Sequence, residues 1–203
     1  MARPLTDTSH ALLGLLSVRP WSTYELAKQV ERSLGWFWPR TERKIYDEAK
    51  RLVESGHATS EAEATGSRPR TVYRITPSGR RALEEWLGRP SAPPKLESEA
   101  LARTFFADSG TLEHLHATLD DLAASASARI HVLRELIEVA DEPEYPFVKR
   151  RHVNAVAWRF QLDYHRMILD WTTWARDQID TWVSTTDPGD WDWHRALMDA
   201  PDG

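Results

Sequence analysis

Cysteine is absent from the 203-residue chain, so a disulfide framework is excluded and a reducing compartment is expected. No uncharged apolar stretch approaches the ~18 residues that cross a bilayer, and the first residues lack the apolar run of a signal peptide. We therefore expect a cytoplasmic protein without membrane contact. Hydrophobic residues nevertheless make up 41% of the chain, which is enough for a packed core.

Positive charge is outnumbered by negative charge overall but is concentrated in one half of the chain. The net charge is −5, a value that would repel nucleic acid. Residues 1–90 hold 15 Lys and Arg against 11 Asp and Glu, a net of +4, whereas residues 91–203 hold 11 against 20, a net of −9. Because salt screens charges beyond ~8 Å, a phosphate responds to the local charge. The first half is therefore the candidate for DNA contact, and the acidic half should lie away from the duplex.

The first half has the element order of a known DNA-binding module. Apolar periodicity predicts helices over 8–18 and 41–55, with another that begins at the capping box Ser22–Glu25. Two short strands are expected over 57–64 and 70–75, and Thr76–Pro77 should start a fourth helix. Three helices, a hairpin and a helix predict a winged helix-turn-helix, in a protein that is mainly α with a small β-hairpin.

Two cationic clusters lie where this module would meet DNA. On the helix over 41–55, Ile45, Ala49, Leu52 and Val53 form a core stripe, and the cations fall off that stripe. The start of this helix is the part that reaches a DNA groove. The hairpin tip adds two arginines around Pro69, which stiffens it. The candidate DNA-binding residues from this pattern are Arg40, Thr41, Arg43, Lys44, Lys50, Arg68 and Arg70.

A proline-rich segment over 89–95 predicts a linker after a DNA-binding domain over 1–88. Beyond it, helical patterns over 96–107, 109–139 and 148–183 predict a helical dimerisation or effector domain over 96–184. Residues 185–203 are expected to be an acidic, irregular tail, with Trp191 and Trp193 as its docking residues.

Tryptophan is unusually frequent, with ten in the chain and six in the acidic half. On the last long helix the aromatic and aliphatic residues cover more than one partner helix needs. They indicate either a buried core or dimer seam, or a pocket for a planar ligand, and both interpretations stay open. The residues concerned are Trp158, Leu162, Tyr164, Ile168, Trp171, Trp174 and Trp182.

Patterns for metal binding and catalysis are weak. His114 and His116 are two residues apart on a predicted helix, so they point away from each other. Asp187, Asp190 and Asp192 lack the glycine and glutamate spacing of a calcium loop. No local signature of a catalytic triad is present. We expect no metal, no cofactor and no enzymatic activity.

The chain resembles the PadR family of bacterial transcriptional regulators. The resemblance rests on HALLGLL at 10–16, TYEL at 23–26, KIYDEAKRLVESG at 44–56 and RPRTVYRITPSGR at 68–80, and it extends loosely to the helical second half. Two positions depart from the family pattern: Thr23 stands where glycine is usual, and Ala49 stands where leucine is frequent.

The resemblance implies a homodimer whose C-terminal helices exchange contacts, and an inverted-repeat DNA operator bound usually as a repressor. It also implies a phosphate contact from the hydroxyl of Tyr46, and release from DNA by a small aromatic or hydrophobic effector. Two other functions stay open: a winged helix used for protein interaction, and a protein that sequesters ligands.

Overall fold

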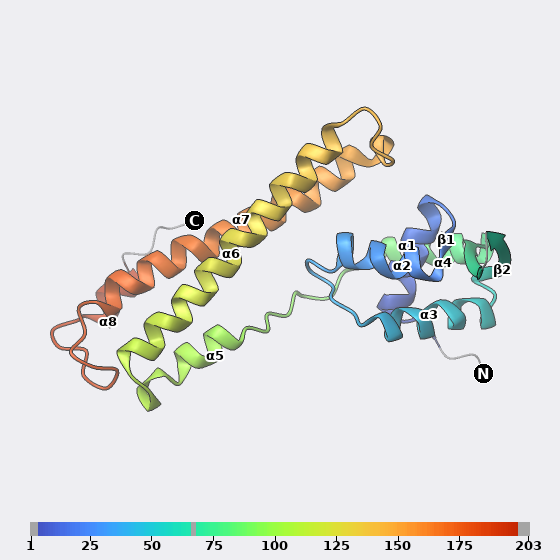
Figure 1. Ribbon diagram of the computed structural model, residues 1–203. Coiled ribbons are helices and arrows are strands. Elements are labelled where there is room, and N and C mark those ends of the chain that lie inside the picture. The colour runs from blue at the N-terminus through green and yellow to red at the C-terminus, as the bar shows by residue number, and fades with distance from the viewer. Residues whose placement is uncertain (1–3, 66–67, 199–203) are drawn as a thin grey trace. The chain divides into compact units, whose positions relative to one another are not determined.

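The structure, a computed structural model, describes residues 4–65 and 68–198 (Figure 1). The chain divides into two compact units, residues 1–94 and 95–203, and each is described by itself. Helices dominate both units, and the first also contains a small antiparallel sheet. The predicted fold class is confirmed.

Four helices form the frame of the first unit: α1 (Asp7–Val18), α2 (Thr23–Gln29), α3 (Glu42–Glu54) and α4 (Pro77–Leu87). The capping box at Ser22 and the Thr76 cap with proline in the first turn are both present, as the sequence predicted. Apolar residues from the first three helices meet in a core that excludes water; its largest fully buried side chains are Leu12, Leu13, Leu16, Leu26, Ile45 and Leu52.

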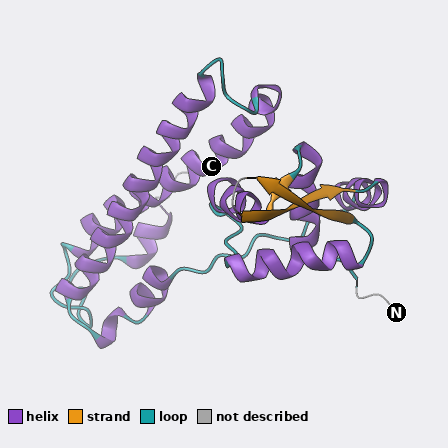
Figure 2. Cartoon of the chain, turned by 45° about the vertical axis from the view of Figure 1, so that its right-hand side comes forward, coloured by secondary structure: helices purple, strands orange, loops and turns teal. Residues whose placement is uncertain are grey.

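The sheet of this unit has three strands in the order β1-β3-β2, all antiparallel (Figure 2). Strands β2 (Ala58–Thr65) and β3 (Arg68–Ile75) form the predicted hairpin, and both extend further toward its tip than the sequence indicated. Strand β1 (Trp21–Ser22) pairs with Tyr73 and Val72 of β3 and was not predicted. Two residues are too few to show the alternation that identifies a strand.

Between α2 and α3 the chain forms a π-helical turn that the sequence pattern did not indicate. Val30–Leu34 continue α2 as a π-helical turn, which ends at Gly35. A Cβ atom at Gly35 would lie 2.5 Å from the carbonyl oxygen of Glu31, so this close approach requires glycine. The turn over 35–41 then carries Trp36 and Trp38 toward the start of α3.

The second unit is built on two long helices, α6 (Leu112–Asp141) and α7 (Arg151–Ile179), which lie side by side and antiparallel (Figure 1). The Arg151 guanidinium closes this hairpin: it donates to the carbonyl oxygens of Ala140 at 2.6 Å, Asp141 at 3.1 Å and Glu142 at 2.6 Å. These bonds satisfy carbonyl groups at the end of α6 that have no partner within the helix.

At the far end of the hairpin, Leu115, Leu119, Ala175 and Ile179 form a buried cluster. The shorter helix α5 (Glu99–Phe105) packs against α6; it covers less of the chain than the predicted helix over 96–107. Within the described ranges, no helix has the length and apolar character needed to cross a membrane.

The tail is more ordered than the sequence indicated. A short helix, α8 (Trp193–Met198), replaces the expected irregular segment. Trp191 docks as predicted, because its ring packs edge-on to Trp182 and its Nε1–H donates to Gln178 Oε1 at 3.0 Å. Trp193 does not dock in the same way, since its side chain is exposed.

Candidate DNA-binding surface

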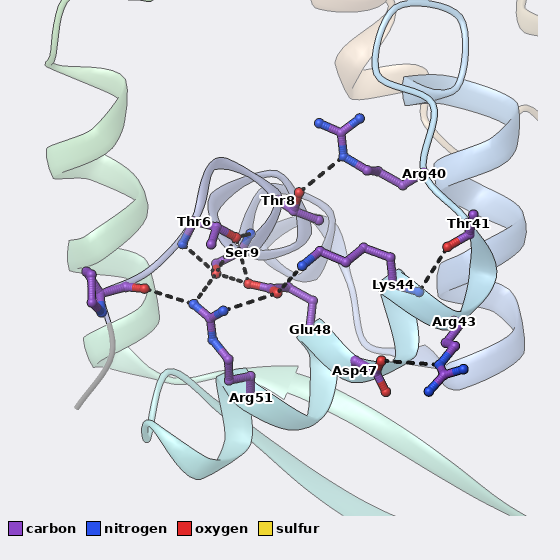
Figure 3. Close-up of polar contacts among 11 residues, drawn as sticks. Thr6, Thr8, Ser9, Arg40, Thr41, Arg43, Lys44, Asp47, Glu48 and Arg51 are labelled. Carbon is purple, nitrogen blue, oxygen red and sulfur yellow. Dashed lines mark hydrogen bonds and ion pairs between the residues drawn. The ribbon is translucent and has the colours of Figure 1, made fainter. Parts of the chain in front are cut away.

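The first turn of α3 is fixed by a cap and by the loop before it (Figure 3). Thr41 accepts a hydrogen bond from the backbone N–H of Lys44, so its side chain is the N-cap of the helix. Arg40 stacks over the Trp38 ring, donates to the Pro39 carbonyl oxygen at 2.6 Å, and reaches the hydroxyl of buried Thr8 on α1 at 3.4 Å. Two of the predicted DNA-binding residues therefore also hold the helix start in place.

The cations of α3 lie on its exposed side, opposite the buried Ile45, Ala49 and Leu52. Arg43 is 92% exposed and lies 3.9 Å from the carboxylate of Asp47. Lys50 is exposed as well. Because these side chains project from the exposed face of α3, they can reach phosphates beside a groove that the helix enters.

Tyr46 lies on α3, and its hydroxyl donates to Oε2 of Glu42, one turn earlier in the same helix, at 3.5 Å. Burial and the negative charge of Glu42 raise the pKa of Tyr46, so the phenol stays protonated at neutral pH. A protonated hydroxyl is a hydrogen-bond donor, which is the role that a phosphate contact requires.

Glu48 is a buried residue behind this surface that the sequence pattern missed. Its side chain is only 2% exposed, yet it carries a charge. Its Oε1 accepts hydrogen bonds from the hydroxyls of Ser9 and of Thr6, at 2.8 Å for Thr6, and both donors come from the start of α1. Lys44 lies 3.7 Å from Oε2, and Arg51 lies 3.5 Å from it (Figure 3). Glu48 thus connects α1 to the helix that presents the cations.

The environment of Glu48 keeps it ionised despite its burial. Burial by itself raises the pKa of this carboxyl, but the hydrogen bonds from Ser9 and Thr6 and the charges of Arg51 and Lys44 outweigh that effect. The net pKa is lowered. A signal for this site was present in the sequence, since position 48 falls inside the stripe of Ile45, Ala49 and Leu52.

The wing carries the second predicted cluster. Arg70 on β3 stands directly opposite Glu63 on β2, and the two side chains form an ion pair at 3.2 Å. Arg74, which the sequence analysis did not single out, pairs with the same carboxylate at 3.1 Å. Gly66 and Ser67 of the predicted tip, and the side chains of Arg68 and Pro69, lie outside the described residues.

The predicted pocket or seam residues of the second unit lie along α7 and just beyond its end. Trp171 and Trp182 pack against the buried cluster of Leu115, Leu119, Ala175 and Ile179. The other predicted residues are half-buried, apart from Trp174, which is exposed. An open groove of about 570 Å³ beside α5 and α6 is lined by other residues, among them Phe106, His114 and Leu115.

A second apolar stripe on α7 was not recognised from the sequence. Its members are spaced by three, four, seven and seven residues, and all are exposed: Val153, Val156, Phe160, Met167 and Trp174. A spacing of three and four that repeats every seven residues is the pattern of a helix seam.

As for metal binding, no group of three or more His, Asp or Glu side chains within the described ranges could hold an ion.

The comparisons with known proteins agree with this architecture. A model of the transcriptional regulator PadR-like family matches residues 12–85. The negative transcriptional regulator PadR of Bacillus subtilis is 30% identical over 99 residues, which cover 48% of this chain and 54% of that protein. A probable transcriptional regulator of Mycobacterium tuberculosis is 33% identical over 87 residues, or 42% and 46% of the two chains. The matched segments thus span about half the length of these curated relatives.

Solved structures extend the likeness in fold to the second unit. Bacillus subtilis PadR in complex with operator DNA superposes with a TM-score of 0.74 at 22% identity, over 86% of this chain and 99% of that one. The same protein in complex with p-coumaric acid gives 0.68 at 23% identity, over 85% and 98%. The Vibrio cholerae virulence activator AphA gives 0.64 at 23% identity, over 82% and 94%.

The fold and the cationic helix define a winged helix-turn-helix protein with a C-terminal helical hairpin. Over residues 12–85, the first unit is similar to the PadR-like family of transcriptional regulators.

The Glu48 cluster makes a prediction about stability. Ser9→Ala removes a donor to the buried carboxylate and should lower the free energy of unfolding of the first unit by about 1–3 kcal/mol. Because the pKa of Glu48 is lower in the folded state, its contribution is present above about pH 4.5 and is lost as the pH falls through the folded-state value. Loss of the Ser9 bond raises that value, so acid unfolding should begin at a higher pH.

Urea unfolding at neutral pH and an acid titration, both followed by tryptophan fluorescence, measure these two effects. Ser17→Ala is the matched control, because the Ser17 hydroxyl lies on the same helix but bonds to the Gly14 carbonyl oxygen. Equal effects of the two substitutions would contradict the assigned role of Glu48.

Proposed function

We propose that the chain is a cytoplasmic, non-enzymatic transcriptional regulator that binds an inverted-repeat DNA operator as a homodimer and acts as a repressor. The observation that supports DNA binding most directly is the exposed cationic face at the start of α3, in a domain similar to the PadR-like family. Bacillus subtilis PadR, which has the same fold, has been solved in complex with operator DNA, and this supports the proposal.

The residues proposed to contact DNA are those predicted from the sequence, and they differ in role. Arg43 and Lys50 are exposed, whereas Arg40 and Thr41 also stabilise the helix start. Lys44 lies beside the buried Glu48, so reversing its charge would disturb the fold as well as DNA contact. A clean test therefore uses Arg43 and Lys50.

The double substitution Arg43→Ala and Lys50→Ala should weaken binding to an operator-containing duplex by about tenfold or more at low salt. The slope of log affinity against log salt should fall by about two units, because two phosphate contacts are lost. Fluorescence anisotropy over a range of salt concentrations measures both quantities.

The matched control replaces an arginine and a lysine in the second unit, Arg134→Ala with Lys149→Ala, both of which are exposed. Its binding and salt slope should remain those of the wild type. Equal losses in both variants would mean that total charge, rather than α3, governs binding. A wild-type chain without salt-dependent DNA binding would favour a protein-interaction or ligand-sequestering function instead.

We propose that the exposed stripe on α7 is the dimer seam. Five exposed apolar side chains in a heptad-like row form a patch that a monomer would leave in water. A second copy of the chain provides an identical row, and a two-fold axis would then set two α3 helices about one DNA turn apart, or a multiple of it.

Val156→Glu with Phe160→Glu should convert the dimer to monomers, because glutamates would be buried without partners in the seam. Ala155→Glu with Thr173→Glu adds the same charge on a different face of α7 and should leave the dimer intact. Sedimentation velocity distinguishes the two states. A wild-type monomer, or a dimer that survives in the first variant, would refute the seam.

We also propose an aromatic effector near Trp158, Trp171 or Trp174. Bacillus subtilis PadR has been solved with p-coumaric acid, an anionic aromatic. Residues 91–203 of this chain carry a net charge of −9, so Coulomb attraction and contact with tryptophan rings favour a cationic aromatic here.

Benzyltrimethylammonium should therefore quench tryptophan fluorescence and release the operator at lower concentration than p-coumaric acid does. Trp158→Phe or Trp171→Phe should weaken both effects, and Trp36→Phe is the control in the first unit. Release can occur only if the ligand prefers the DNA-free protein. If neither compound binds below about millimolar concentration, the tryptophans serve packing alone.

A further inference from the structure

One carboxylate in the wing holds two arginines. Residues at 59, 61 and 63 of β2 share a face of the hairpin with those at 70, 72 and 74 of β3, as the register of the strands requires. On this face Glu63 Oε2 accepts a hydrogen bond from Arg70 Nη2 at 3.2 Å, and Glu63 Oε1 accepts one from Arg74 Nη2 at 3.1 Å. Both guanidinium groups are thus bound to a single acidic side chain.

We propose that Glu63 is an intramolecular competitor of DNA phosphates, which binds Arg70 and Arg74 and thereby lowers the affinity of the wing for duplex DNA. This inference rests on the proposed DNA-binding function. A carboxylate and a phosphate present the same kind of paired anionic oxygens to a guanidinium. A phosphate that approaches the wing must therefore displace Glu63 or share the arginines with it.

The exposure of Glu63 and of its two arginines indicates that Glu63 competes with phosphates rather than positions the arginines. Glu63 is 33% exposed and the two arginines are 47% and 43% exposed, so water and salt keep these ion pairs weak and exchangeable. The backbone pairing of β2 with β3 already fixes the backbone positions of Arg70 and Arg74. Glu63 is not needed to place them, while its negative charge repels a phosphate at the same site.

Glu61 provides an internal comparison. It lies on the same strand and the same face, two residues away, but it is 63% exposed, and its one ion pair within the described residues is with Arg74, at 3.7 Å. Removing the charge of Glu61 therefore changes the net charge of the wing by the same amount but leaves the tighter pairs at Glu63 in place.

The test compares Glu63→Gln, Glu61→Gln and the wild type on a fluorescein-labelled, mixed-sequence duplex about three helical turns long. Mixed sequence is suitable because phosphate contact does not depend on base identity. Glu63→Gln should bind about threefold more tightly at low salt, and Glu61→Gln should gain clearly less. Thermal unfolding of each variant shows whether the fold is kept. Equal gains, no gain, or weaker binding by Glu63→Gln would overturn the proposal.

A double-mutant cycle separates release of the arginines from simple repulsion. In a chain that also carries Arg70→Ala and Arg74→Ala, the gain from Glu63→Gln should fall to no more than the gain from Glu61→Gln, because only repulsion is removed and no arginine is left to release. A gain that stays at about threefold in this background would show that Glu63 acts only as a negative charge, and the competition would be refuted.

The experiment also distinguishes failure of this inference from failure of the proposed function. A wild-type chain that shows no salt-dependent binding would refute DNA binding itself. Binding that is unaffected by Arg70→Ala with Arg74→Ala would refute a role of the wing, and with it the competition, while leaving α3 as the contact. Binding that these substitutions weaken, without a gain from Glu63→Gln, would refute the competition alone.

Discussion

The orientation of α3 depends on the hydrogen bonds and ion pairs of one buried carboxylate, that of Glu48. A charge removed from water is costly unless donors and opposite charges surround it. Here the donors come from the first turn of α1 and the charges from α3 itself. The hydrogen bond from Ser9 to Glu48 ties the orientation of α3 to the capped end of α1. Arg51 extends the connection to the Pro4 carbonyl oxygen at 2.8 Å. The cationic face is therefore set by a polar contact, while the apolar core supplies most of the burial.

The proposed DNA surface contains its own counter-charges. Arg43 faces Asp47, Lys44 faces Glu48, and Arg70 faces Glu63. Each of these contacts is weak where it is exposed, but each must be rearranged or shared when a phosphate arrives. Such a surface would bind DNA less tightly than its count of cations suggests, because each phosphate contact replaces an ion pair that already exists within the protein. The net charge of the first 90 residues, +4, describes this balance better than the 15 cations do.

The sequence predicted the elements whose signals are local. Caps at Ser22 and Thr76, and the periodic apolar residues of α1 and α3, located helices to within a few residues, because capping and burial act over one or two turns. Features that depend on distant partners were missed. Strand β1 exists only because Trp21 meets Tyr73, and Glu48 is tolerated in the core only because α1 brings Thr6 and Ser9 to it. On α7, the tryptophans drew attention to one stripe, and the exposed row through Phe160 became evident only once α6 was seen to cover the other face.

If two copies associate through the exposed seam on α7, the internal ion pairs of the DNA surface affect how well the dimer selects its site. One winged helix in which part of the cations are already paired would bind any duplex weakly, and so would discriminate poorly in the presence of many non-specific sites. Joining two such units makes the second contact intramolecular, and the effective concentration restores affinity only on DNA that offers two half-sites at the right spacing. Weak single contacts then become an advantage, because binding to a lone half-site stays low while binding to the pair rises. In this arrangement the acidic second unit supplies the coupling between the two surfaces, and its negative charge disfavours any orientation in which it would lie against the phosphates itself.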